Sequence, residues 1–269
     1  MVSTNKRAIL IISFGTSVKE ARQKTIDVFE RLVKNTYPHW EVRHAFTSEI
    51  IIDRLKNEQG IVVDTIEESL NRLKYEGFTH ILVQPTHIIN GLEHARMLAI
   101  LQLYQKDFVS IQTGAPLLTS IHDLQVVISG IMENYKETPK DTGFLFLGHG
   151  TDSASNAVYS KLENMARQMG YLHLFTGTIK MDSDMDTVLG QISQIGYKKM
   201  ILQPLLFLSG YHVRNEIAGN APSSWKSRLN SFGIETTCIL KGLGEYTFIQ
   251  QLLLSHMASA FQKEIDPPI

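Results

Sequence analysis

The strongest constraint on the fold is a short pattern that the chain carries twice. Residues 8–17 read AILIISFGTS and residues 143–153 read GFLFLGHGTDS, each an apolar strand followed by Gly-Thr. A second pair follows in the same order, with THILVQPTHIINGLEH at 79–94 and KKMILQPLLFLSGYHV at 198–213. Because both pairs keep their order at similar spacing, we expect two related lobes.

The segment NYKETPKDTG (134–143) is the expected junction of these lobes. It is polar, and Pro139 and Gly143 interrupt regular structure there. The sequence therefore predicts an N-terminal lobe, residues 1–137, and a C-terminal lobe, residues 138–269.

Short apolar runs rich in β-branched residues alternate along the chain with amphipathic stretches. Segments 17–35 and 65–77 have apolar residues at helical spacing, and the second ends at Gly77, a typical helix stop. Such alternation predicts an α/β fold with parallel sheets. The predicted strands are residues 8–13, 40–46, 79–84, 109–114, 143–148, 172–177, 199–204 and 235–240.

Composition excludes some classes of function. The 269 residues, 43% of them hydrophobic, suffice for a sizeable core, and the net charge of -1 argues against a general nucleic-acid binder. The single cysteine, Cys238, permits no intrachain disulfide, which fits a reducing compartment. The apolar run at 8–14 is too short to span a membrane and lacks a signal-peptide cleavage pattern. We therefore expect a soluble, cytoplasmic protein that binds neither nucleic acid nor membrane.

Three polar side chains fall at or just after predicted strand ends. His149 stands between two glycines, and the second repeat places Glu93 at the position that corresponds to His212. Ligands of open parallel sheets bind outside the carboxyl ends of the strands, and facing lobes would bring these ends to one cleft. Two imidazoles and a carboxylate suit a divalent first-row metal such as Co²⁺, Ni²⁺, Fe²⁺ or Zn²⁺. A neutral imidazole also accepts protons near pH 7.

Further residues at these ends are candidates for binding a ligand. Gly15-Thr16 and Gly150-Thr151 are each predicted to end a strand and begin a helix, whose free N–H groups favour an anion. The alternative is that the threonines only cap their helices. His87, in QPTHII, is another candidate, and a structural histidine in an apolar neighbourhood is the alternative there.

Long segments of the chain resemble the anaerobic sirohydrochlorin cobaltochelatases, a family of class II chelatases that stands alongside protoporphyrin ferrochelatase. The resemblance covers nearly the whole chain and implies two similar Rossmann-like lobes with parallel sheets. It also implies that His149, Glu93 and His212 handle the metal. The segments that carry it are SFGTSVKEARQKTI (13–26), RHAFTSEIIIDRLK (43–56), VQPTHIINGLEH (83–94), GHGT with Asn156 and Tyr159, QPLLFLSGYHVRNEIAG (203–219) and SSWKSRLNSFGIETTCILKGLGE (223–245).

The activity that the resemblance implies is insertion of Co²⁺ into sirohydrochlorin, a polycarboxylate tetrapyrrole, in anaerobic cobalamin biosynthesis. Substrate-binding residues would then include Gly15, Thr16, Gly150, Thr151 and His87. The divalent metal is itself a substrate, and no further cofactor is expected. The sequence has no G-x-x-x-x-G-K-[ST] loop for ATP.

Alternatives to this activity stay open at the level of sequence. One is a nickel or iron chelatase that acts on a related tetrapyrrole, and another is a non-catalytic tetrapyrrole- or haem-binding protein. A two-lobed solute receptor is a third, against which the missing signal peptide argues. The apolar segments QVVISGIMENY (125–135) and FIQQLLLSHMASAF (248–261) fit either a core or the interface of a homo-oligomer.

Three departures from the family's pattern fall at the predicted site. The family has a glutamate where this chain has Lys180, and a protonated lysine cannot bind a metal. Asp182 or Asp184 are candidates to replace that carboxylate. Ser153 stands where the family has a second histidine, and Tyr211 stands where it has an aspartate. These changes bear on metal preference, substrate and turnover.

Overall fold

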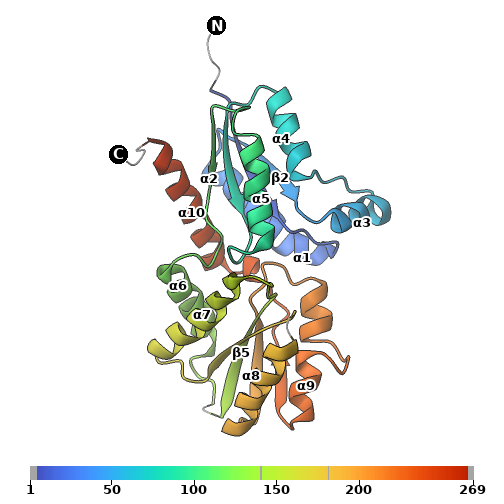
Figure 1. The fold of residues 1–269 in the computed structure, drawn as a ribbon, viewed down its shortest axis with the longest axis vertical. Coiled ribbons are helices and arrows are strands. Elements are labelled where there is room, and N and C mark those ends of the chain that lie inside the picture. The colour runs from blue at the N-terminus through green and yellow to red at the C-terminus, as the bar shows by residue number, and fades with distance from the viewer. Residues whose placement is uncertain (1–4, 140, 181, 266–269) are drawn as a thin grey trace. The chain divides into compact units, whose positions relative to one another are not determined.

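Two sets of four parallel strands form the framework of the protein, seen as a computed structural model in Figure 1. The structure describes residues 5–139, 141–180 and 182–265. Contacts divide the chain into two compact units. Unit 1 comprises the described residues of Met1–Thr119 and Ile249–Ile269, and unit 2 comprises those of Ser120–Phe248.

The two sheets have the same topology. The strand order is β2-β1-β3-β4 in unit 1 and β6-β5-β7-β8 in unit 2, and every pairing is parallel. All eight predicted strands are confirmed, and so is the α/β class. The strands are β1 (Arg7–Ser13), β2 (Glu41–Phe46), β3 (His80–Pro85), β4 (Ser110–Thr113), β5 (Thr142–Gly148), β6 (Leu174–Thr178), β7 (Lys199–Pro204) and β8 (Glu235–Cys238).

Helices connect successive strands, because parallel neighbours need a long crossover connection. The predicted helix at 65–77 is confirmed as α4, with Gly77 in a left-handed conformation just beyond it. The single helix expected over 17–35 is two helices, because Thr25 leaves helical geometry and its hydroxyl donates to the carbonyl of Ala21. Unit 1 contains α1 (Lys19–Lys24), α2 (Ile26–Thr36), α3 (Glu49–Gln59), α4 (Ile66–Tyr75), α5 (Leu92–Leu103) and most of α10 (Thr247–Ile265); unit 2 contains α6 (Ile121–Met132), α7 (Ala157–Gln168), α8 (Asp182–Ile195) and α9 (Trp225–Ser231).

The central strand of each sheet is buried over nearly its whole length. β1 lies between β2 and β3, and β5 lies between β6 and β7, so each is covered by neighbours on both edges as well as by helices. This explains why both strands are continuous apolar runs and do not alternate with polar residues. Their side chains pack into the cores of their own units, with α4 and α5 in unit 1 and with α8 and α9 in unit 2.

The repeated Gln-Pro motif has a structural role in each unit. Gln84 and Gln203 are fully buried, and each side-chain amide donates to the carbonyl of the proline that follows it, at 2.8 Å and 3.0 Å. Gln84 also donates to the carbonyl of Ala115, and Gln203 accepts a hydrogen bond from the hydroxyl of Tyr246. A buried amide with such partners holds the carboxyl end of its strand in place.

The units divide at different residues from those expected. The expected boundary, between residues 137 and 138, lies inside unit 2, because α6 belongs to that unit and packs against α7. Ser120 begins α6 with a capping box that pairs it with Asp123. Most of α10 belongs to unit 1, where His256 lies 3.1 Å from the carbonyl of Ala115. Unit 1 is therefore built from two separate segments of the chain.

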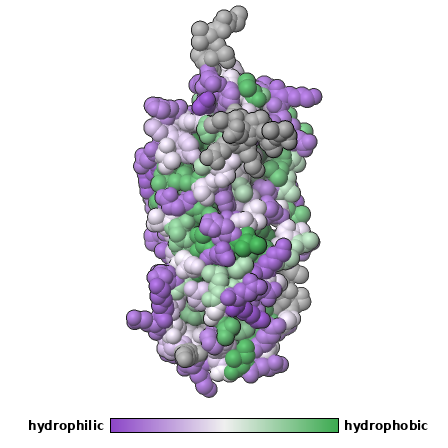
Figure 2. Space-filling view, turned by 90° about the vertical axis from the view of Figure 1, so that its left-hand side faces the viewer, coloured by the Kyte–Doolittle hydropathy of each residue, from purple (hydrophilic) through white to green (hydrophobic). Residues whose placement is uncertain are grey.

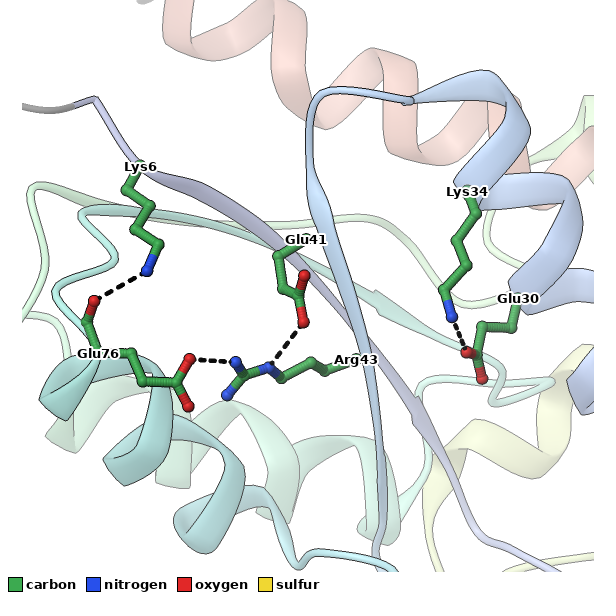
Figure 3. Close-up of polar contacts among 6 residues, drawn as sticks. All are labelled: Lys6, Glu30, Lys34, Glu41, Arg43 and Glu76. Atoms are coloured by element: carbon green, nitrogen blue, oxygen red, sulfur yellow. Dashed lines mark hydrogen bonds and ion pairs between the residues drawn. The ribbon is translucent and has the colours of Figure 1, made fainter.

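Charged side chains form ion pairs and hydrogen bonds near the amino end of the unit 1 sheet (Figure 3). The guanidinium of Arg43, on β2, pairs with the carboxylates of Glu41 and Glu76. Lys6, just before β1, donates to the backbone carbonyl of Glu76 at 3.0 Å. The hydrogen bond from Arg43 is the main reason that the pKa of Glu76 lies below its usual value. These pairs occupy the end of the sheet opposite to the one where the sequence places the ligand.

The surface is mixed in character. Figure 2 shows hydrophilic residues over much of the face drawn there, with hydrophobic residues in separate patches. Phe14, Leu92 and Tyr211 are exposed apolar or aromatic side chains, and Phe14 occupies the position of His149 in the repeat. Leu92 and Tyr211 directly precede Glu93 and His212. Among the helices of the described residues, none has the length and apolar character needed to cross a membrane.

Candidate metal centre

His149 is presented by the carboxyl end of β5. The strand ends at Gly148, and the chain turns at Gly150, whose φ of 81° lies in the left-handed region that L side chains rarely adopt. A Cβ atom at Gly150 would also lie 2.9 Å from the Cβ of Thr178, on β6. The glycine after the histidine is therefore required by the turn, and this turn places the imidazole at the strand end.

His212 comes from the loop that follows β7. It precedes a short π-helix, η3 (Val213–Ile217). The imidazole rings of His149 and His212 lie 4.8 Å apart between centroids and are inclined at 76°. Two of the three predicted metal-handling residues are thus brought together within unit 2.

Hydrogen bonds indicate which ring nitrogen of each histidine is free. Nδ1 of His149 lies 3.1 Å from the carbonyl oxygen of Gly150, and Nδ1 of His212 lies 2.7 Å from Oε2 of Glu216. Both partners only accept hydrogen bonds, so both Nδ1 atoms carry hydrogen. In a neutral imidazole the lone pair is then on Nε2, the form in which histidine binds metals.

The electrostatic surroundings keep His149 neutral. Burial is the main cause that lowers its pKa, and the neighbouring His212 and Lys180 lower it further. Lys180 lies beside the histidine because its backbone N–H donates to the carbonyl of His149 at 3.1 Å. Lys180 itself is exposed. His149 is therefore unprotonated at neutral pH and its Nε2 is available.

Glu93 belongs to unit 1. It lies in the first turn of α5, and its carboxylate pairs with Arg96 at 3.0 Å. It borders a pocket of about 220 Å³ within that unit. Among the described residues, no three His, Cys, Asp or Glu side chains are grouped closely enough to hold a metal ion. The participation of Glu93 with the two histidines stays a prediction.

The predicted Gly-Thr turns are in place, but no helix begins directly at them. Gly15 has a φ of 96°, and α1 begins at Lys19; after Gly150 the next α-helix begins at Ala157. The hydroxyl of Thr16 accepts the N–H of Val18, the N-cap residue of α1, which itself has no side-chain cap.

The turn at Thr151 has its own internal partners. The backbone N–H of Thr151 donates to the side chain of Asn156 at 2.9 Å. Ser153 accepts the N–H of Ser155. Asp182 and Asp184 lie outside the residues whose side chains the structure describes.

His87 lies in unit 1, just after the end of β3. Neither of its ring nitrogens has a hydrogen-bond partner in the structure, and its ring centroid lies 6.0 Å from that of His94. Burial, with a contribution from His94, lowers the pKa of His87 to about 4. Two buried ring nitrogens without partners are costly, which is consistent with contact to a ligand.

Sequence reasoning missed two polar features. The first is Glu216, although its place four residues after His212 is a signal for contact on a helix. The second is a buried network in which Ser13 contacts both His44 and Thr86, at 3.0 Å and 2.9 Å. Because His44 comes from a different strand with no motif around it, nothing in the sequence connects it to Ser13.

Two solved structures share this fold. SirB from Bacillus subtilis with Fe³⁺ has a TM-score of 0.69 at 15% identity, covering 97% of this chain and 98% of that one. CbiX, described as the terminal enzyme for biosynthesis of siroheme in denitrifying bacteria, has a TM-score of 0.58 at 14% identity, covering 94% and 99%. The fold is thus the two-lobed chelatase fold.

Sequence comparison narrows this class to one family. A model of the cobalt chelatase (CbiK) family matches residues 7–262. The sirohydrochlorin cobaltochelatase of Salmonella typhimurium is 30% identical over 97% of this chain and 98% of that protein. The sirohydrochlorin cobaltochelatase CbiKC of Nitratidesulfovibrio vulgaris is 31% identical over 95% and 90%. The chain belongs to the cobalt chelatase (CbiK) family.

Proposed function

We propose that this protein inserts Co²⁺ into sirohydrochlorin in cobalamin biosynthesis. The observation that carries the proposal is the pair of imidazoles, His149 and His212, whose Nε2 atoms are both left free by the hydrogen bonds at Nδ1. Membership of the cobalt chelatase family and the two related cobaltochelatases support the same activity.

Insertion of a divalent metal into a tetrapyrrole releases two pyrrole protons, so the site must bind a metal and accept protons. His212 binds Co²⁺ through Nε2. His149, neutral because its pKa is lowered, binds the incoming metal or accepts a proton at the same atom. Glu93, from unit 1, relays protons or completes the coordination. No cofactor beyond the divalent metal takes part.

The tetrapyrrole has a flat apolar ring and several carboxylates. Exposed apolar side chains next to the site residues, such as Tyr211 and Leu92, suit the ring. The turns at Gly15-Thr16 and Gly150-Thr151 and the imidazole of His87 contact the rest of the substrate. We further propose that the reaction takes place in the cytoplasm, without nucleic acid or a membrane, and that the protein acts alone or as a homo-oligomer.

The test is to mix the purified protein with metal-free sirohydrochlorin and Co²⁺ and follow the visible spectrum. We expect conversion well above the uncatalysed rate, and a competition among Co²⁺, Ni²⁺ and Fe²⁺ ranks the metals, which affinity alone does not. A bound chromophore whose conversion is not accelerated would instead indicate a tetrapyrrole carrier.

A further inference from the structure

One contact at the metal centre distinguishes the two histidines. Nδ1 of His149 is held by a backbone carbonyl, which the turn at Gly150 provides regardless of side chains. Nδ1 of His212 is held by the carboxylate of Glu216 at 2.7 Å. The free nitrogen of His212 therefore depends on one replaceable side chain.

The local backbone places Glu216 for this contact. His212 adopts helical geometry at the start of η3, and Glu216 lies within η3, so the two side chains are four residues apart on one short helix. Both side chains are partly accessible, with 37% of His212 and 40% of Glu216 exposed. The buried Val213 and Ile217 anchor the same helix in the core of unit 2.

The chemistry of the contact gives it a consequence for metal binding. A carboxylate that accepts from Nδ1 fixes the tautomer and ring orientation of a histidine and makes Nε2 a stronger ligand. Without Glu216, the proton of a neutral ring can move to Nε2, and this tautomer cannot bind a metal through that atom. The ring also becomes free to turn.

We infer that Glu216 is a positioning residue that holds His212 in its metal-binding tautomer and orientation. The inference rests on the proposed function, because it assigns a role toward the metal that the protein inserts. Glu216 acts through His212 and does not itself contact the metal.

Two substitutions separate the hydrogen bond from the charge. Glu216→Ala removes the acceptor, whereas the amide oxygen of Glu216→Gln still accepts from Nδ1. Glu235→Ala is the control, since Glu235 is an exposed carboxylate of unit 2 whose partner is Lys199, at 3.6 Å. Co²⁺ is titrated into each protein without tetrapyrrole and followed by its visible ligand-field absorption, and the KM for Co²⁺ is measured in the insertion assay.

We expect Glu216→Ala to weaken Co²⁺ binding by about 10- to 100-fold and to raise the KM for Co²⁺ in parallel. The KM for sirohydrochlorin should change little. Glu216→Gln should recover most of the Co²⁺ affinity, and Glu235→Ala should match the unsubstituted protein. Glu216→Ala with unchanged affinity, or Glu216→Gln as weak as Glu216→Ala, overturns the inference.

A measurement on the unsubstituted protein covers the case in which Glu216→Ala does not fold. Two-bond ¹⁵N–¹H correlation spectra of ¹⁵N-histidine-labelled, metal-free protein report which ring nitrogen of His212 carries hydrogen. Hydrogen on Nδ1 is expected, and hydrogen on Nε2 alone overturns the inference. If the unsubstituted protein neither binds Co²⁺ nor accelerates insertion, the proposed function fails, whatever the tautomer of His212.

Discussion

Units 1 and 2 share one topology but carry different side chains at equivalent positions. His149 in unit 2 corresponds to Phe14 in unit 1, and His212 corresponds to Glu93. Lys180 corresponds to Ser48, because their N–H groups donate to the carbonyls of His149 and Phe14. The fold supplies equivalent strand ends twice, and at these equivalent positions unit 2 has two imidazoles where unit 1 has a phenyl ring and a carboxylate.

The two units also differ in the residues at the carboxyl ends of their inner strands. In unit 1, Ser13 ends β1 and links His44 to Thr86 through buried hydrogen bonds. In unit 2, Gly148 and Leu205 occupy the positions of Ser13 and Thr86. At these two positions unit 1 therefore has hydrogen-bonding side chains, where unit 2 has a glycine and a leucine. The comparison shows that the fold places loops at the same strand ends in both units, while a few side chains determine whether those ends can bind a metal.

The largest expected effect on the rate of Co²⁺ insertion comes from replacing the equivalent residues His149 and Phe14 with alanine. His149→Ala should lower the rate of Co²⁺ insertion by about 10²- to 10⁴-fold, because a metal ligand or proton acceptor is lost. Phe14→Ala, at the same place in unit 1, should change the rate by less than about tenfold. Steady-state insertion kinetics measure both, and equal losses would show that the units contribute alike.

The next effect concerns the two glycine turns. Gly15→Ala should lower the free energy of unfolding by about 2–4 kcal/mol, because its φ is positive and the added Cβ would lie 2.5 Å from the ring of Phe46. Gly150→Ala should cost somewhat less, since its closest atom is at 2.9 Å. Urea unfolding measures both. Gly190→Ala in α8, where nothing lies within 4 Å, is the neutral control, and a similar loss there would refute the strain argument.

A smaller effect is the pH dependence of stability that His44 should give to unit 1. Burial lowers the pKa of His44 to about 3, and Glu30, at 3.8 Å, is too far to offset this. Between about pH 6.5 and 3 the unfolded state therefore binds a proton that the folded state does not, and stability falls as the pH falls. For His44 alone the loss from pH 6.5 to 5 is about 2 kcal/mol.

The variant His44→Gln tests this dependence. It should be less stable than the unsubstituted protein at pH 7.5 but should lose about 2 kcal/mol less on going to pH 5, by urea unfolding. Thr176, the equivalent residue on β6, does not titrate in this range, so this position in unit 2 supplies no such slope. An unchanged slope in His44→Gln would place the proton uptake elsewhere.

The smallest effect should come from Lys180→Ser, which gives unit 2 the residue of unit 1. Removing the cation should raise the lowered pKa of His149 toward its ordinary value, so the acid limb of the rate of Co²⁺ insertion should move up by a few tenths of a pH unit. Lys161→Ser, on the exposed face of α7, is the control. A downward shift in Lys180→Ser would contradict the assigned electrostatics.

Much of the fold could be predicted from the sequence, because strands of parallel sheets are short apolar runs with clear ends. The internal repeat also predicted which strand ends are equivalent, and it led to His149 and His212. The break at Thr25 could not be predicted, because apolar spacing continues across it. The units divide at Thr119–Ser120 and again at Phe248–Ile249, because α6 packs with unit 2 and most of α10 with unit 1, and such tertiary contacts leave no local signal in the sequence.

The site was only partly predictable for a related reason. Strand ends and glycine turns are local features, whereas hydrogen bonds such as His44 to Ser13 join residues far apart in the chain. The place of Glu93 with respect to the metal stays a prediction, since it belongs to the other unit.

Because unit 1 is built from two segments of the chain, the two units become available for folding in an order that differs from their order in the sequence. Its first segment leaves the ribosome before any of unit 2, but α10 from Ile249 onward is synthesised after all of unit 2. Domains generally fold as units during synthesis, beginning at the amino terminus. Of the two units, unit 2 is therefore the first whose residues have all been synthesised.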